Sequence, residues 1–74
     1  MPKPYPLRIV LKVLASKGFI FISQRGSHAK YRKEKENEAA LTVIVPAHEK
    51  EIRYGTFRSI LRQSKLKESD FKKK

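Results

Sequence analysis

The fold of this chain is decided by residues 19–45, which have the sequence FIFISQRGSHAKYRKEKENEAALTVIV. The segment Phe19–Gln24 begins with β-branched and aromatic residues, and it predicts a strand with both faces at least partly covered. A turn at Arg25–Ser27 leads to a second strand at His28–Lys33, and a third strand follows at Ala39–Val45. Because the links between these strands are short, we expect an antiparallel meander.

Residue alternation in the second strand assigns its two faces. Successive side chains in a strand point to opposite sides, so His28, Lys30 and Arg32 share one face and Ala29 and Tyr31 share the other. The polar run from residue 34 to residue 38 predicts the connection to the third strand. The face that carries His28 is therefore cationic.

The flanking segments predict helices. Leu7, Val10, Leu11 and Leu14 recur at the spacing of one helix face, and Gly18 marks the end of that helix. Residues 1–6, with prolines at positions 2, 4 and 6, predict an extended leader.

The last third of the chain predicts a second helix after an irregular polar stretch at residues 47–54. Gly55 and Thr56 open this helix, with an N-terminus available to an anion, and its core positions are Phe57, Ile60 and Leu61. Leu66 and Phe71 predict one further helical turn, and residues 72–74 predict a frayed basic tail.

This order of elements defines the fold class. A helix, three strands and a helix predict an α+β domain with an α-β-β-β-α layout, in which both helices cover one face of a three-stranded antiparallel sheet. A chain of 74 residues forms one domain, so we assign residues 1–74 to it. The uncovered face of the sheet then exposes His28, Lys30 and Arg32.

Charge narrows the classes of partner. Lys and Arg number 18 and Asp and Glu number 7, so the formal net charge is +11. Such a chain favours a polyanion, an acidic protein, or both. The absence of cysteine excludes disulfides and Cys-ligated zinc, and no acidic cluster predicts a metal site, so we expect no cofactor. No apolar run is long enough to span a bilayer, and we expect a cytoplasmic protein.

His28 is the leading candidate for chemistry. An imidazole exchanges a proton near neutral pH, and RNA cleavage through the 2′-hydroxyl needs proton transfer together with cations that offset charge on the phosphorus. Arg25, Lys30 and Arg32 supply those cations, and the Gly26–Ser27 turn offers backbone N–H groups and a hydroxyl to a phosphate. Taken alone, an exposed histidine on a strand is more often only a surface residue.

The second proton-transfer group stays open among His48, Lys30 and Tyr31. For His48 we expect a structural role in the loop before the second helix, with proton transfer as the alternative. Tyr31 lies on the predicted core side, where packing is the simpler role. Further along, Arg53, Arg58, Arg62 and Lys65 are candidates for contacts to a nucleic-acid backbone or for a solvated helix face.

Two sequence blocks resemble the HicA (YcfA-like) family of mRNA interferase toxins. The first comprises Gly18-Phe19, the pentapeptide from Gln24 to His28, and Tyr31; the second comprises Thr42-Val43, Val45-Pro46, His48 and the run from Gly55 to Gln63. The resemblance implies a double-stranded-RNA-binding-domain-like fold and a toxin of a type II toxin–antitoxin module. It also implies metal-independent endoribonuclease activity on mRNA, which arrests translation and growth, with His28 as the catalytic residue. The implied partner is a HicB-type antitoxin in a heteromeric complex.

Two other functions are weighed against this one. A non-catalytic RNA-binding module of the same fold would bind A-form RNA by its shape and phosphates. A pure partner-binding protein would use its charge only to attract an acidic antitoxin. Neither alternative requires a histidine beside a Gly-Ser turn.

Overall fold

The computed structural model describes residues 4–72. Residues 1–3 of the predicted leader and residues 73–74 of the predicted tail lie outside that range. The elements follow in the order β1 (Tyr5–Pro6), α1 (Leu7–Ser16), β2 (Ile20–Arg25), β3 (His28–Lys35), β4 (Glu38–Pro46), β5 (Glu51–Ile52), α2 (Tyr54–Ser64) and α3 (Glu68–Lys72).

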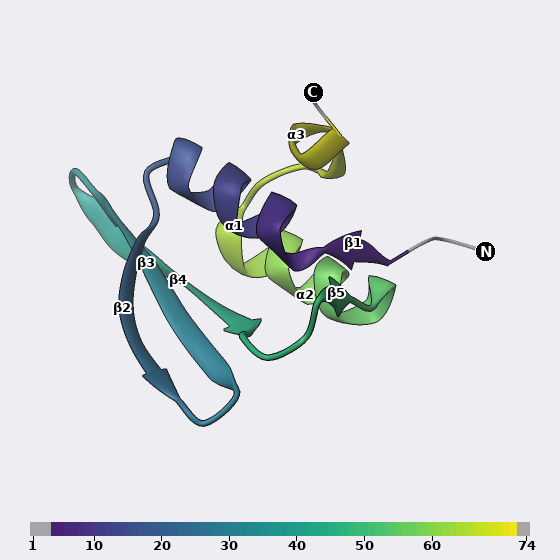
Figure 1. Ribbon diagram of the computed structural model, residues 1–74. Helices are drawn as coiled ribbons and strands as arrows, with labels where there is room; N and C mark the ends of the chain where they lie inside the picture. The colour runs from purple at the N-terminus through teal and green to yellow at the C-terminus, as the bar shows by residue number, and fades with distance from the viewer. Residues whose placement is uncertain (1–3, 73–74) are drawn as a thin grey trace.

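The architecture confirms the predicted α+β layout. Strands β2, β3 and β4 form a three-stranded antiparallel sheet, and β1 pairs with β5 in a separate two-stranded sheet. Figure 1 shows α1 and α2 on the same side of the three-stranded sheet, with α3 beyond them and β2 at the far edge. Within residues 4–72, no helix combines the length and the apolar character needed to cross a membrane.

Helix α1 ends as its glycine predicts. Gly18 has a φ of 97°, and its N–H donates to the Ala15 carbonyl at 3.1 Å. The N–H of Phe19 donates to the Leu14 carbonyl at 2.9 Å, which completes the paired hydrogen bonds of a Schellman motif. The motif turns the chain from α1 toward β2 and places Phe19 in the core.

The predicted faces of β3 are confirmed. Ala29 is buried and Tyr31 is partly buried, whereas His28, Lys30 and Arg32 are exposed. The helix-covered face packs against α1, α2 and α3 in one apolar core. Its buried members are Val10, Leu14, Phe19, Val43, Val45, Ile52, Phe57, Ile60 and Phe71.

The prediction that both faces of β2 are at least partly covered is wrong. All six residues of β2 are exposed, and the exposed fractions of Ile20 and Phe21 are 59% and 54%. β2 is an edge strand, and α2 packs against β4 at the opposite edge. The apolar run of this segment reaches the core only through Phe19, which precedes the strand.

The predicted connection at residues 34–38 is also wrong in its length. β3 continues to Lys35 and β4 begins at Glu38, so only Glu36 and Asn37 form the turn. Asn37 adopts a φ of 60°, which this residue tolerates better than most. Lys35 and Glu38 form an ion pair of 3.2 Å that closes the hairpin.

A second small sheet was not predicted. Tyr5 and Pro6, expected in the leader, pair with β5 inside the stretch predicted to be irregular, and the Leu7 N–H donates to the Lys50 carbonyl at 2.8 Å. This pairing brings Ile52 into the core with no exposed surface. The predicted final turn is confirmed as α3, whose Phe71 is buried and whose last residue is Lys72.

Candidate functional site

A tight turn sets the position of His28. Arg25 and His28 face each other across the β2–β3 hairpin, and Gly26 and Ser27 connect them. Gly26 has a φ of 57°, the positive value that a two-residue type II′ turn requires at its first position. A Cβ built on Gly26 would touch nothing within 4 Å, so backbone conformation, not space, calls for glycine here.

Hydrogen bonds hold this turn in place. The Gln24 side-chain amide donates to the Gly26 carbonyl at 3.1 Å, and the Ala47 N–H donates to the Ser27 carbonyl at 2.6 Å. The second bond ties the turn to the chain just after β4. As a result, the backbone that carries His28 is held from both sides.

The predicted cationic face is present in the structure. His28, Lys30 and Arg32 alternate along β3, and the register places Arg25 of β2 directly opposite His28. Arg32 lies 3.9 Å from Glu34, a surface pair that contributes little. With respect to residues 4–72, Arg25 and Lys30 form no ion pair, so their charges remain available to a ligand.

His28 also lines a surface groove of about 410 Å³. The other residues that line it are Ile44 and Pro46 of β4, Glu49 and Arg53 from the segment before α2, and Thr56 of α2. Arg53 is the residue that precedes α2, and no side chain caps the helix there. The groove therefore brings together an imidazole, a guanidinium, a carboxylate and a hydroxyl.

The sequence identified only part of this groove. Thr56 was recognised as the start of a helix open to an anion, and Arg53 as one of several cations, but neither was assigned to the surroundings of His28. Glu49 was not singled out at all. Their proximity to His28 depends on how the β4–α2 segment folds back along the edge of β4, and local patterns do not encode that path.

The three candidates for the second proton carrier lie in different places. Lys30 shares the exposed face with His28. Tyr31 is partly buried on the helix-covered face, where its ring meets Phe21 edge-on. His48 approaches the side-chain amide of Gln24 at 3.4 Å, and Gln24 pairs with the buried Ala29 on the same helix-covered side.

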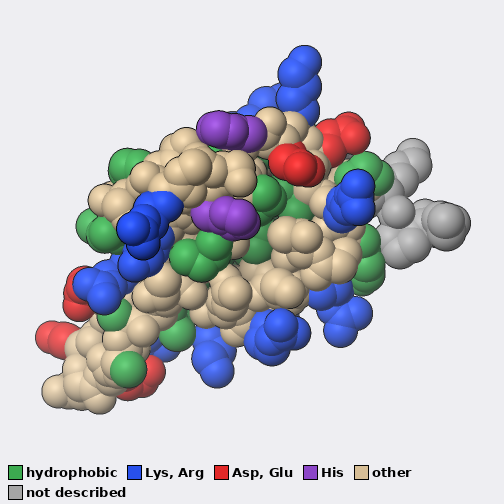
Figure 2. Space-filling model, turned by 90° about the horizontal axis from the view of Figure 1, so that it is seen from below, with side chains coloured by type: hydrophobic (Ala, Val, Ile, Leu, Met, Phe, Trp, Pro, Cys, Tyr) green, Lys and Arg blue, Asp and Glu red, His purple; other side chains and the backbone are tan. Residues whose placement is uncertain are grey.

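Figure 2 shows both histidine side chains at the surface, among Lys and Arg side chains. His48 follows the end of β4, and it does not line the groove that contains His28. Among the residues that the structure describes, no group of three or more His, Asp or Glu side chains is placed to hold a metal ion.

Comparison with known protein families gives a match to most of the chain. A family model described as the HicA toxin of bacterial toxin–antitoxin matches residues 8–66. The match runs from the first turn of α1 to the segment after α2, and it includes His28 and every residue of the groove. No curated protein matches the chain.

Proposed function

The chain belongs to the HicA toxin family of bacterial toxin–antitoxin systems, and from this premise we propose that it is an endoribonuclease that cleaves mRNA through His28. Membership of the family makes it the toxin of such a module and implies an antitoxin partner. The activity, its substrate and the identity of the partner are our proposal.

One observation carries the proposal: His28 is exposed and lines a groove that Arg53 and Thr56 also line. A histidine that only contributed to stability would be buried or hydrogen-bonded to a structural partner. The hydrogen bonds in this region hold the backbone of the turn and leave the His28 ring free among the described residues.

The chemistry requires two proton transfers. The 2′-hydroxyl of a ribose loses its proton and attacks the adjacent phosphorus, so that a 2′-O–P bond forms as the P–O5′ bond breaks. The leaving 5′-oxygen takes up a proton, and the products are a 2′,3′-cyclic phosphate and a 5′-hydroxyl. We assign one of these transfers to His28 and consider Lys30, on the same face, the best placed of the three earlier candidates for the other.

The surrounding cations would bind the RNA backbone and offset the negative charge that grows on the phosphorane. Arg25 and Lys30 flank His28 within the sheet, Arg32 extends the same face, and Arg53 approaches from the groove. The N–H groups and hydroxyl of the Gly26–Ser27 turn, with the Thr56 hydroxyl, would orient a phosphate. These contacts follow the backbone, so they predict binding that weakens as salt rises.

The test is to incubate RNA with the purified chain in the presence of EDTA. We expect cleavage by the wild type, a loss of about 10²- to 10⁴-fold for His28→Ala, and nearly unchanged activity for His48→Ala. The second variant is the matched control, because it removes the other histidine, which does not line the groove. A fully active His28→Ala variant would overturn the assignment.

The exposed cationic face also favours a second candidate, a module that binds RNA without cutting it. This candidate shares the dependence of binding on salt but predicts intact RNA after incubation with the wild type. Circular dichroism of each variant distinguishes a lost function from a lost fold.

We further propose that the antitoxin is a HicB-type protein that forms a heteromeric complex with this toxin. We place the activity in the cytoplasm, where mRNA is found. Co-purification of the two co-expressed proteins tests the complex, and recovery of each protein alone would contradict it.

A further inference from the structure

The exposed edge of β2 has no role in the function described above. β2 pairs only with β3, and no hydrogen bond from any other described element reaches the backbone of residues 20–25. The opposite edge of the sheet differs, because the side chain of Gln63 accepts from the Ile44 N–H at 3.0 Å. The β4 edge is thus partly covered by α2, whereas the β2 edge is open.

Large apolar side chains cluster at this open edge. The exposed fractions of the consecutive residues Ile20, Phe21 and Ile22 are 59%, 54% and 42%. The register places Ile20 on the exposed face with Arg32 and Phe21 on the helix-covered face with Tyr31, so apolar side chains lie on both faces of the open edge. Exposed apolar side chains gathered beside polar residues are typical of interaction sites. Edges of sheets are usually protected by lysine, proline or a bulge, and here only the irregularity between Phe21 and Ser23 offers such protection.

These residues are only partly covered by the rest of the chain. Phe21 meets Tyr31 edge-on with ring centroids 5.7 Å apart, and its exposed fraction is 54%. By contrast, Phe19, immediately before the strand, is buried in the core. Three consecutive apolar residues are therefore largely outside the core at this edge.

Charge indicates the kind of partner. Arg32 lies opposite Ile20, Lys30 opposite Ser23 and Arg25 at the end of β2, so cations border the apolar residues. The net charge of the chain is +11, and two copies brought together at this edge would repel each other. An acidic protein segment gains from the same charges.

We propose that the antitoxin docks on β2 by adding an extended, acidic segment as a fourth strand, with apolar side chains packed over Ile20 and Phe21. Backbone hydrogen bonds supply part of the affinity in this mode of recognition, and side chains on alternate faces supply specificity. A segment that follows β2 to Arg25 ends directly beside His28. The inference rests on the proposed antitoxin partner, but not on cleavage by His28.

Binding of the purified HicB-type antitoxin from the same operon tests the proposal by calorimetry. For Phe21→Glu and Ile20→Glu we expect affinity at least about tenfold weaker than that of the wild type. Ala15→Glu is the matched control, because it makes the same change of charge at an exposed apolar residue of α1, and its affinity should stay within about twofold.

Two further measurements test whether the antitoxin adds a strand to β2 and whether this edge binds RNA instead. Amide exchange in β2 should slow on complex formation if a strand is added, and unchanged exchange across residues 20–25 would overturn that mode of docking. RNA cleavage by free Phe21→Glu should match the wild type. If this variant loses cleavage and keeps antitoxin binding, the edge belongs to RNA and the proposal is wrong.

Loss of cleavage by His28→Ala with intact antitoxin binding supports both proposals. An inactive wild type whose complex still depends on Phe21 refutes the ribonuclease alone. If the wild type fails to bind the antitoxin, the docking proposal falls while the cleavage assay stands independently.

Discussion

Two regions of the molecule use phenylalanine differently. At the helical end, Phe57 is fully buried, stacks on Tyr5 with centroids 3.9 Å apart and meets Phe71 edge-on at 5.1 Å. At the β2–β3 hairpin, Phe21 is 54% exposed and meets only Tyr31 among the described aromatic rings.

Polar contacts follow the same division. The hydroxyl of Tyr5 donates to Glu68 at 3.0 Å and that of Tyr54 donates to the same carboxylate at 3.4 Å, so one side chain of α3 joins β1 and α2. The outer face of the hairpin has exposed cations without comparable partners. The comparison teaches that this small domain concentrates its stability at one end and leaves the other open to ligands.

The proposed difference in stability between the two regions is tested most directly by truncating one phenylalanine in each. Phe57→Ala should cost about 3–5 kcal/mol of unfolding free energy, because it removes a fully buried ring that contacts β1 and α3. A core of this size supplies no more than about 3–5 kcal/mol, so we expect the variant to be largely unfolded at 25 °C. Urea titration followed by circular dichroism measures the effect.

Phe21→Ala is the matched control, with an expected loss below about 1 kcal/mol, since its ring is largely solvated in the folded state. Equal losses in the two variants would show that the hairpin contributes to the core as much as the helical end does. The proposed division of the molecule would then be wrong.

Smaller substitutions at the helical end test the two hydrogen bonds to Glu68 separately. Tyr5→Phe keeps the ring and removes its hydrogen bond to Glu68, so we expect a loss of about 1 kcal/mol at pH 7. Tyr54→Phe, which removes the longer bond to the same carboxylate, should cost less. The reverse ranking in thermal melts would contradict the role assigned to β1.

The contribution of the Tyr5 hydroxyl to stability can also be tested with Tyr5→Phe at high pH. Burial, and then Glu68, raises the pKa of Tyr5 above its ordinary value of 10.0. The folded protein therefore holds the phenolic proton more tightly than the unfolded chain does. The stabilisation that the Tyr5 hydroxyl provides is present below pH 10 and is lost as pH rises through the folded pKa. The melting temperatures of wild type and Tyr5→Phe should therefore converge at high pH.

Local patterns predicted the regular elements well. The spacing of Leu7, Val10 and Leu14 located α1, and alternation in β3 assigned His28 to the exposed face. Both signals depend only on near neighbours in the sequence, because the side chain must point to one side or the other of its own element. The fold class followed from the order of those elements.

Features that depend on distant segments escaped prediction. The run Ile20–Ile22 looked like covered strand, but an apolar pattern has the same form whether the chain itself or a partner covers it. β1 and β5 have two residues each, too few for any periodicity, and Tyr5 pairs with Ile52 across most of the chain. Arg53 and Glu49 lie near His28 only because the loop after β4 folds back.

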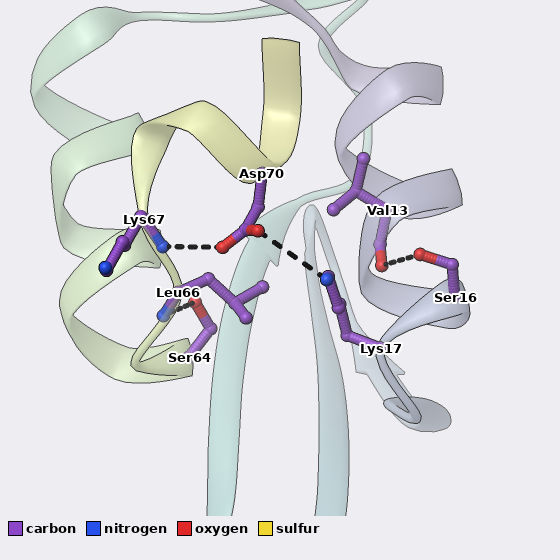
Figure 3. A network of polar contacts seen from close by, with 7 residues as sticks. All are labelled: Val13, Ser16, Lys17, Ser64, Leu66, Lys67 and Asp70. Carbon is purple, nitrogen blue, oxygen red and sulfur yellow. Dashed lines mark hydrogen bonds and ion pairs between the residues drawn. The ribbon is translucent and has the colours of Figure 1, made fainter. Parts of the chain in front are cut away.

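The smallest expected effect concerns the contact between α1 and α3, drawn in Figure 3. Asp70 accepts the Lys67 N–H at 2.9 Å and lies 3.6 Å from the Lys17 ammonium, so it holds the start of α3 and connects it to the end of α1. The hydrogen bond from the Lys67 backbone, aided by Lys17, lowers the pKa of Asp70 below its ordinary value of 3.8. A lowered pKa means that the folded protein binds this proton less tightly than the unfolded chain, so the stabilisation is present above pH 3.8 and is lost as pH falls through the folded pKa.

The difference in melting temperature between wild type and Asp70→Asn should therefore be largest near neutral pH and shrink below pH 3.8. Glu36→Gln, in the exposed β3–β4 turn, makes the same change of net charge far from α3 and allows general charge effects to be subtracted. A difference that stays constant from pH 7 down to about pH 2 would mean that the ionised carboxylate is not what connects α3 to α1. In that case α3 would be held only by the packing of Phe71 against its apolar neighbours. The two ends of the molecule would then differ in their apolar packing and not in their ion pairs.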